Sequence, residues 1–563
     1  MTTDQVRPVD HVADQFVADY AVLDPLAATY FGIRGYDDQV TDISPDGFAA
    51  RRQLTSDARA RMAATEPTDQ REAVAKASFL ERQDVALARY DAGTPQSQVS
   101  IITSELHRVR SVFDLMRTDD EDAWRTIDAR LSKIPGAIDD YRTTLTRAAD
   151  AGHVSAKRQL RALAQQVRTW TGQEGRAGSF FDDFVARADG LPASLRQQLD
   201  EHAASSTAAF ALFERFLTDE LLPRGRDKDA VGRDAYGPES RLFLGATIDL
   251  EETYAWAWDE LKRIDDEMVR VAQQIKSGAS VDEAVEILDA DPARSIDGKE
   301  AFREWMQQLA DETIAELADT HFDIPEPVRR IECCLAPTND GGIYYTGPSE
   351  DFERPGRMWW AVPDEQTRFS TWREVTTVYH EGAPGHHLQV AQTAYRSDLL
   401  NRWQRTMCWV SGHGEGWALY AERLMDELGY LDDPGDKLGM LDAQGMRAAR
   451  VILDIGVHAE LEIPGDNPFG FHPGEAWTAE LCLEFLRQHC RMEEAIISFE
   501  VNRYLGWPGQ APSYKVGERV WLQARDEVRR RKGAGFDLAA FHRQALDLGS
   551  LGLDPMRTLL AQL

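Results

Sequence analysis

Apolar residues in the first part of the chain recur with the period of a helix. Within Arg158–Trp170 the residues Leu160, Leu163, Ala164 and Val167 stand at positions i, i+3, i+4 and i+7. This spacing puts side chains on one face of a helix. Similar patterns mark the runs 195–222, 250–275 and 297–317. They predict a chain that is helical over most of its length.

The pattern changes between about 321 and 370. Beta-branched and aromatic residues there alternate with turn signals, which is typical of short strands. The candidate strands are Ile331–Leu335, Gly342–Tyr345 and Arg357–Val362. Helical patterns return from Trp372 and continue to the end. We therefore expect a mostly α protein of the α+β class, with a large helical body and one small β-sheet.

A polar segment at 223–238, rich in glycine and proline, is the best candidate for a boundary. It predicts a helical N-terminal region over 1–236. A second region, 237–563, would hold the sheet and the C-terminal helices. The sequence shows no internal repeat.

The net charge and the cysteine content limit the partners and the cellular location that we expect for this chain. The formal net charge is −32, which argues against nucleic acid and against an anionic membrane surface as partners. Residues Met1–Gln5 show no basic start of a secretory signal, and no stretch resembles a membrane helix. The five cysteines form no CxxC pair, so we expect a reduced, cytoplasmic protein.

Three histidines gather in one short segment. His380 is followed by Glu381, and His386 and His387 come a few residues later. A His-Glu pair with a second histidine is the core of the zinc hydrolase pattern, in which the glutamate holds a water molecule. Three of the 13 histidines within eight residues make a loop of unrelated histidines the weaker interpretation. The segment therefore predicts a zinc site.

The spacing of the histidines is stretched. In the usual pattern the second histidine is at i+4, about 40° away around a helix. On a regular helix His386 would be about 120° away from His380, and His387 within about 20° but about 10 Å further along the axis. Pro384 and Gly385 would interrupt that helix. The break can bring either His386 or His387 back towards His380. Helix geometry alone therefore does not decide which of the two is the second histidine ligand.

Glu415 is the candidate for a further ligand. It stands at the start of an expected helix some 30 residues downstream, and Glu422 follows two turns later on the same face. Zinc sites often include a carboxylate, and a second carboxylate can orient a ligand histidine. The alternative for Glu415 is an acidic residue stabilised by the helix dipole. His413 is a weaker candidate ligand.

These segments resemble a known family. The strings HEGAPGHHLQ and EGWALYAERL are similar to those of the bacterial family known only as domain of unknown function 885. Further similar pieces occur in order at 27–32, 354–356, 450–458 and 503–517. The resemblance implies a zincin-like core, related to helical metallopeptidases with a glutamate ligand, in region 237–563. It also favours His386 over His387, because Gly-His ends the motif in related zincins.

The resemblance suggests further site residues. Arg450, Asp454 and His458 recur at i, i+4 and i+8, and Asp454 could orient His458. An exposed ion pair is the alternative. Related helical peptidases stabilise the oxyanion with a Tyr or His from the C-terminal part, which suggests Tyr504 or Tyr514. The alternative for both is a place in the aromatic core.

The strand Arg357–Val362 precedes the histidine segment. In zincins an edge strand in this position pairs with an extended peptide, so we expect the same role here. The alternative is that Trp359 and Trp360 only cover a core.

Together these features predict a zinc-dependent hydrolase that cleaves short peptides or a related amide bond. His380, His386 and Glu415 would hold the metal, and Glu381 would act as general base. Tyr504, Tyr514 or His458 would stabilise the oxyanion. Two other classes stay open: an enzyme acting on a metabolite amide, and a non-catalytic helical binding protein. The sequence does not determine the substrate, exo- or endo-action, or the oligomeric state.

Overall fold

The chain forms two compact units. The computed structural model describes residues 7–175, 178–318, 320–336, 342–349, 351–363 and 365–562. Residues Met1–Gln5, expected to carry no secretory signal, lie outside the described residues. The first unit comprises Met1–Glu72, Phe79–Glu239 and Ser498–Pro508, and the second comprises Ala73–Ser78, Ser240–Ile497 and Gly509–Leu563.

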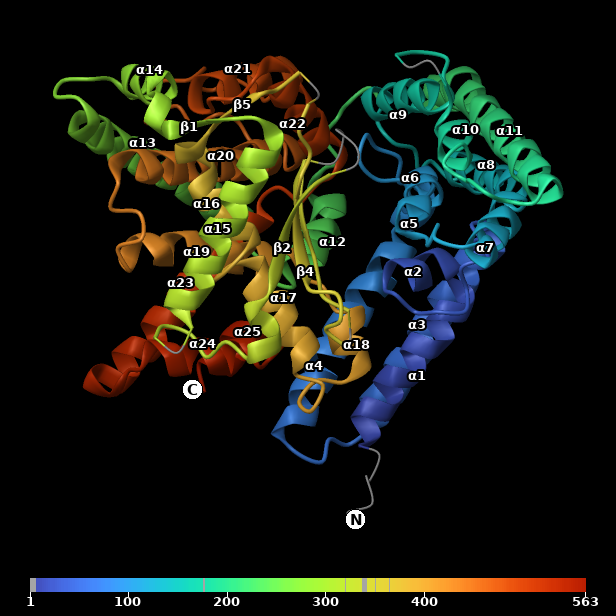
Figure 1. Ribbon diagram of the computed structural model, residues 1–563, viewed down its shortest axis with the longest axis horizontal. Helices are drawn as coiled ribbons and strands as arrows, with labels where there is room; N and C mark the ends of the chain where they lie inside the picture. Colours follow the sequence, from blue (N-terminus) through green and yellow to red (C-terminus); the bar gives the residue numbers. More distant parts are fainter. Residues whose placement is uncertain are drawn as a thin grey trace. The chain divides into compact units, whose positions relative to one another are not determined.

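Helices dominate both units, as the hydrophobic pattern predicted (Figure 1). Those of the first unit are α1 (Pro8–Leu23), α2 (Pro25–Tyr30), α3 (Pro45–Ala64), α5 (Thr94–Ser97), α6 (Glu105–Ser111), η1 (Val112–Leu115), α7 (Glu121–Leu131), α8 (Ile134–Asp150), α9 (Lys157–Trp170), α10 (Phe180–Val185), α11 (Ala193–Arg215), the π-helical η2 (Phe216–Leu221) and η3 (Leu222–Arg224). Helices with residues in both units are α4 (Gln70–Asp91), α12 (Arg233–Leu244) and α22 (Glu494–Gly506). Those of the second unit are α13 (Leu250–Ile275), α14 (Val281–Ala290), η4 (Pro292–Arg294), α15 (Lys299–Leu317), η5 (Glu326–Arg329), α16 (Thr371–Glu381), α17 (His386–Tyr395), α18 (Arg402–Thr406), α19 (Ser411–Glu427), α20 (Pro434–His458), α21 (Ala479–His489), α23 (Ser513–Lys532), η6 (Gly533–Gly535), α24 (Leu538–Leu546) and α25 (Leu553–Leu560).

The first unit has an apolar core built from helix faces. In α9 the four residues that share a face, Leu160, Leu163, Ala164 and Val167, are all buried, which confirms the predicted helix and its inner side. Aromatic rings fill the space between helices, as where Tyr141 stacks on Phe213 at 5.4 Å between centroids. Such burial of apolar surface is the main favourable contribution to folding.

The second unit contains the predicted sheet. Strands β2 (Ile331–Leu335), β4 (Gly356–Trp360) and β3 (Ile343–Thr346) lie in that order, with β2 parallel and β3 antiparallel to β4. A separate pair joins β1 (Ser295–Asp297) to β5 (Arg368–Ser370). In Figure 1 the strands β2 and β4 run beside α15 and α17.

The sheet corrects one expectation. The strand at Arg357–Val362 is not an edge strand, because β4 has a hydrogen-bonded neighbour on each side. Its Met358 pairs with Cys333 of β2 and with Tyr345 of β3. A peptide therefore cannot add to β4. Trp360 is 3% exposed and packs in the core against the sheet, as the alternative interpretation proposed.

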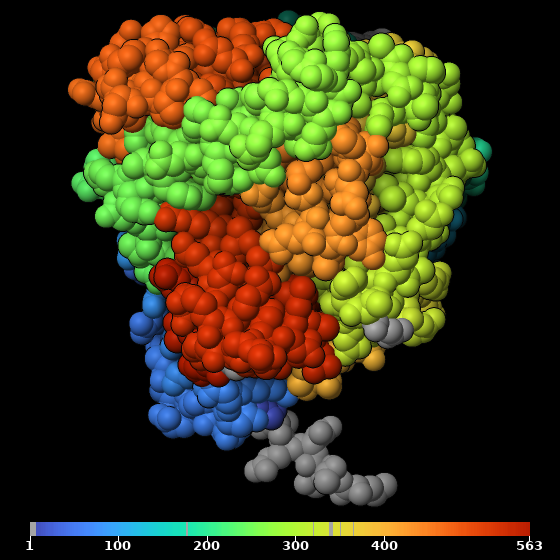
Figure 2. Space-filling model, turned by 90° about the vertical axis from the view of Figure 1, so that its left-hand side faces the viewer, coloured from blue at the N-terminus to red at the C-terminus, as the bar shows by residue number. Residues whose placement is uncertain are grey.

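Helices α19 and α23 of the second unit cross at very short distance. Gly416 of α19 faces Gly517 of α23 so closely that a Cβ atom on either would overlap the backbone of the other helix. Only glycine permits this approach. Figure 2 shows the neighbouring surface, where the red C-terminal helices lie beside the orange segment that follows α19 and the green helix α13.

In the part of the chain that the structure describes, no helix combines the length and apolar character that a membrane crossing requires. The five cysteines are all free, and four of them are buried.

The glycine crossing generates a stability prediction. Gly517→Ala should lower the free energy of unfolding by about 1–3 kcal/mol, because the added methyl group overpacks the interface. Urea denaturation followed by circular dichroism measures this. Gly445→Ala in α20 is the matched control, since its Cβ would meet Ile264 at an ordinary 3.7 Å. Equal stability of the two variants would contradict a tight crossing.

Candidate metal centre

A break between two helices shapes the histidine segment. Helix α16 ends at Glu381 and α17 begins at His386, so the predicted interruption at Pro384–Gly385 is confirmed. The Gly385 N–H donates to the Tyr379 carbonyl at 3.0 Å. A Cβ on Gly385 would overlap the carbonyls of residues 379 and 380, so the tight turn requires glycine.

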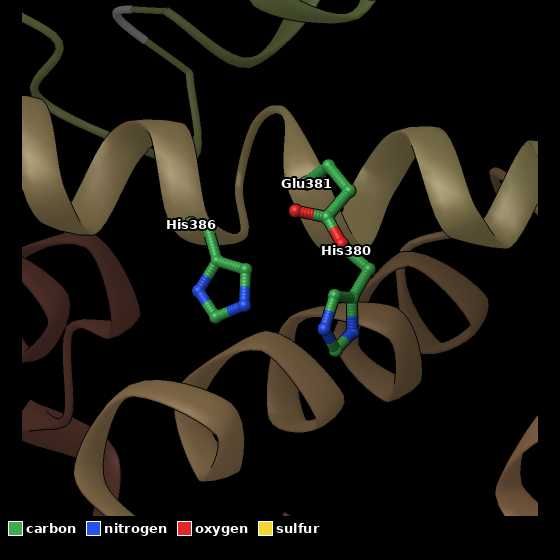
Figure 3. A group of neighbouring side chains, drawn as sticks. All are labelled: His380, Glu381 and His386. Atoms are coloured by element: carbon green, nitrogen blue, oxygen red, sulfur yellow. The ribbon is translucent and has the colours of Figure 1, made fainter. Parts of the chain in front are cut away.

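The break brings His380 and His386 together. Their ring centroids are 4.8 Å apart and the rings are nearly perpendicular, at 88°. Figure 3 shows them extending from the two sides of the break toward α19, with Glu381 next to them. One ligand atom from each of the three residues lies within 4.8 Å of the others. All three side chains are buried, with 4% of His380 and 7% of Glu381 and His386 exposed.

Glu415 completes this group from α19. Its Oε2 lies 3.4 Å from Nε2 of His380 and 3.3 Å from Nε2 of His386. Glu415 lies one turn inside α19, which begins at Ser411, rather than at its start. One carboxylate oxygen thus faces both ring nitrogens.

A second carboxylate, that of Glu422, binds the other ring nitrogen of His380. Nδ1 of His380 donates to Glu422 Oε1 at 2.7 Å, and Thr376 Oγ1 donates to Glu422 Oε2 at 2.6 Å. The sequence predicted that Glu422 orients a ligand histidine, and the structure shows its hydrogen bond to His380. Sequence reasoning missed Thr376, although its position one turn before His380 was a usable signal.

The other two histidines of the region point elsewhere. His387 Nε2 donates to the Val328 carbonyl at 2.7 Å, and its Nδ1 lies 3.0 Å from the Tyr345 hydroxyl. Burial lowers its pKa to about 4. His413 accepts a hydrogen bond from Gln389 at 3.0 Å, and burial lowers its pKa to about 3. Within the described residues neither ring forms an ion pair with Glu415, in contrast to His380 and His386.

Burial and neighbouring charges shift the pKa values of the groups in this site. Burial alone would lower the pKa of His380, but its hydrogen bonds to Glu415 and Glu422 outweigh burial and raise the pKa to about 9. Burial would raise the pKa of Glu415, but His386 and His380 outweigh it and hold that pKa well below its usual range. For Glu381 burial prevails and raises the pKa. The pKa values of the two carboxyl groups are thus shifted in opposite directions, down for Glu415 and up for Glu381.

Two buried polar atoms of the group have no hydrogen-bond partner in the described residues. They are Oε2 of Glu381 and Nδ1 of His386. A buried polar atom without a partner costs free energy, so Oε2 of Glu381 points to a group that binds there. Nδ1 of His386 is the ring nitrogen other than Nε2, which faces Glu415. Two imidazole nitrogens and a carboxylate oxygen are a donor set that zinc accepts.

The polar stripe of α20 is interior. Arg450, Asp454 and His458 are 5%, 1% and 0% exposed, so the alternative of an exposed ion pair is wrong. Asp454 Oδ1 accepts from the Gly509 N–H at 2.9 Å. His458 ends α20 and is not part of the group formed by His380, Glu381 and His386.

The two candidate tyrosines fall in different units. Tyr514, in the first turn of α23, has its ring 4.9 Å from the Arg450 guanidinium carbon. Tyr504 belongs to the first unit, is 2% exposed and donates its hydroxyl hydrogen to Glu500. Sequence reasoning missed Arg447, which lies 5.9 Å from the Tyr514 ring; its place one turn before Arg450 was the available signal.

Comparison with known proteins establishes the fold and the family. No curated protein matches the chain. The fold is similar to a solved structure described as "the putative lipoprotein from Colwellia psychrerythraea", with 22% identity, a TM-score of 0.83 and 98% of each chain covered. It is also similar to "a putative lipoprotein of unknown function from Shewanella oneidensis", with 18% identity, a TM-score of 0.73 and 98% of each chain covered.

At these identities the likeness is one of fold. Residues 25–560 match the family described as "Bacterial protein of unknown function (DUF885)". The resemblance stated from the sequence motifs is thereby confirmed as far as the family. The chain belongs to the bacterial family DUF885.

Proposed function

We propose that this protein is a zinc-dependent hydrolase with a zincin-like core, which cleaves short peptides or a related amide bond. The observation that carries the proposal is the position of Glu415, whose carboxylate oxygen faces Nε2 of both His380 and His386 at 3.4 and 3.3 Å. Glu381, adjacent in sequence to His380, lies beside this group.

These distances suit tetrahedral zinc. Zinc bonds of about 2.0–2.1 Å to nitrogen and oxygen imply ligand atoms about 3.3–3.4 Å apart at the corners of a tetrahedron. His380, His386 and Glu415 would supply three corners and leave one for water. A bound cation would also offset the mutual repulsion of the carboxyl groups of Glu415, Glu422 and Glu381.

Each residue has a role in such a hydrolysis. When bound, zinc would lower the pKa of a water molecule and polarise the scissile carbonyl. Glu381 takes the proton from the water and passes it to the leaving amine, and its raised pKa suits this double role. Glu422 accepts from Nδ1–H of His380, which leaves the Nε2 lone pair facing the ligand group. Tyr514 is the candidate donor to the oxyanion.

The outer strand β3 favours a peptide over a metabolite amide. Within the described residues β3 has β4 as its one strand neighbour, and we propose that an extended peptide adds along its other side. Tyr345 of β3 lies 3.0 Å from His387, the residue after His386. The strand that would receive a substrate is thus β3, in place of β4.

The metal site predicts a defined zinc content. Purified protein should carry about one zinc per chain, because three ligands and water complete a single site. His380→Ala and His386→Ala should lose it, and elemental analysis measures this. His387→Ala is the matched control, since its ring nitrogens already bond Val328 and Tyr345. Zinc lost from the His387 variant but kept in the His386 variant would overturn the ligand choice.

Glu381 should be needed for turnover but not for zinc. In Glu381→Gln the metal should stay while hydrolysis of a peptide library falls by about 100- to 10,000-fold, the usual contribution of a general base. Glu374→Gln on the same helix is the control and should keep normal turnover, because Glu374 lies toward Trp360. Zinc lost from the Glu381 variant but retained in Glu415→Gln would reverse the roles of the two carboxylates.

Tyr514 should act on turnover alone. Tyr514→Phe keeps the ring and removes one hydrogen-bond donor, so kcat should fall by roughly 100-fold while zinc content and KM stay unchanged. Tyr504→Phe serves for comparison, because that hydroxyl already donates to Glu500. Normal turnover in both single variants and in the double variant would leave His458 as the candidate donor.

A further inference from the structure

Trp409 is the one exposed tryptophan in the described part of the chain. It is 48% exposed, whereas the other tryptophans there are buried or partly buried. A single exposed apolar side chain is common on protein surfaces and by itself indicates no function. Trp409 differs from such side chains because it contacts the candidate metal centre.

The indole of Trp409 lies against two parts of that centre. Its ring centroid is 6.1 Å from that of His386, and the two rings are tilted by 55°. The indole also covers Gly414, the residue before Glu415, where a Cβ atom would overlap its six-membered ring. Trp409 therefore packs on one candidate ligand and on the backbone of α19 beside another.

The chain on both sides of Trp409 is fixed in the interior. Cys408 and Val410 are 6% and 0% exposed. The Cys408 thiol donates to the Ser550 carbonyl at 3.1 Å, and the Val410 N–H donates to Ser550 Oγ at 3.2 Å. The indole between these two anchored residues is thus positioned before any ligand binds. Such preorganisation lowers the entropic cost of binding.

An exposed indole beside buried metal ligands supplies an apolar contact for a molecule bound at the centre. Ligand sites in proteins commonly combine a few polar groups with apolar or aromatic walls. Since the indole contacts a ligand of the proposed metal, the side chain that meets it belongs to a residue close to the cleaved bond.

We propose that Trp409 forms an apolar subsite of the metal centre, so that the preferred substrate is a peptide with a large apolar or aromatic side chain near the cleaved bond. An aromatic side chain suits this subsite best, because aromatic rings pack on an indole in edge-to-face or offset arrangements. The inference rests on the proposed hydrolase function and adds its substrate class.

Binding tests the proposal without turnover. In the Glu381→Gln protein, calorimetry would compare pentapeptides Ala-Ala-X-Ala-Ala in which X is Phe, Leu, Ala or Lys. One large side chain among alanines can reach the subsite in whichever register the peptide binds. The Phe peptide should bind about 10- to 100-fold more tightly than the Ala peptide, the usual effect of burying one large apolar side chain. The Leu peptide should lie between them.

Variants assign this advantage to the indole. Adding Trp409→Ala should abolish the advantage of the Phe peptide, and Trp409→Phe should retain part of it. Zinc content and the affinity for the Ala peptide should stay unchanged, which distinguishes a subsite from a merely structural role. Tyr395→Ala is the matched control and should leave the advantage intact. Tyr395 is 38% exposed and lies on α17 about 14 Å along the helix axis from His386.

Four results would overturn the proposal: equal binding of the Phe and Ala peptides, an advantage that survives Trp409→Ala, its loss in Tyr395→Ala as well, or binding of none of the peptides. Tightest binding of the Lys peptide, lost with Trp409, would also overturn it, in favour of a cationic side chain held by a cation–π contact.

Kinetics separate this proposal from the hydrolase function. In the otherwise unchanged protein, kcat/KM for the Phe peptide should exceed that for the Ala peptide by a similar factor, and Trp409→Ala should remove the difference. Cleavage of both peptides at equal rates would leave the hydrolase standing and remove only the subsite. A binding preference that depends on Trp409, without any cleavage, would keep the subsite and remove the hydrolase.

Discussion

The interruption between α16 and α17 is the constraint on which the site depends. On a continuous helix His386 would point about 120° away from His380. The short turn through Gly385, which has no room for a Cβ, redirects the chain so that both rings face α19. The stretched spacing of the motif and the break that compensates for it therefore belong together. A regular helix would need the usual four-residue spacing to reach the same geometry.

Close packing of α19 against α23 accompanies the position of Glu415, which completes the group with the two histidines. Glu415 reaches the two histidines because α19 lies tightly against α23 at Gly416 and Gly517, where side chains would hold the helices apart. Glu422, two turns further along α19, then accepts a hydrogen bond from Nδ1 of His380. A single helix thus carries both carboxylates that contact His380, and its close approach to α23 depends on two residues that have no side chain.

Buried charge links the site to α20. Carboxylates dominate the interior around the histidines, and burial would disfavour their ionised forms. His380, His386 and the guanidinium of Arg447 oppose that effect. Arg447 of α20 is therefore among the charges that favour the ionised form of Glu422.

Local patterns in the sequence determined the helices, the three strands, the family and the histidine cluster with Glu415, because periodicity and motif spacing are properties of neighbouring residues. Only the tertiary structure decided what depends on contacts between distant segments. It placed β4 inside its sheet, directed His387 toward Val328, and assigned residues 498–508 to the first unit. Strand order, the partner of a ring nitrogen and the unit that a segment joins are set by packing, which no local spacing encodes.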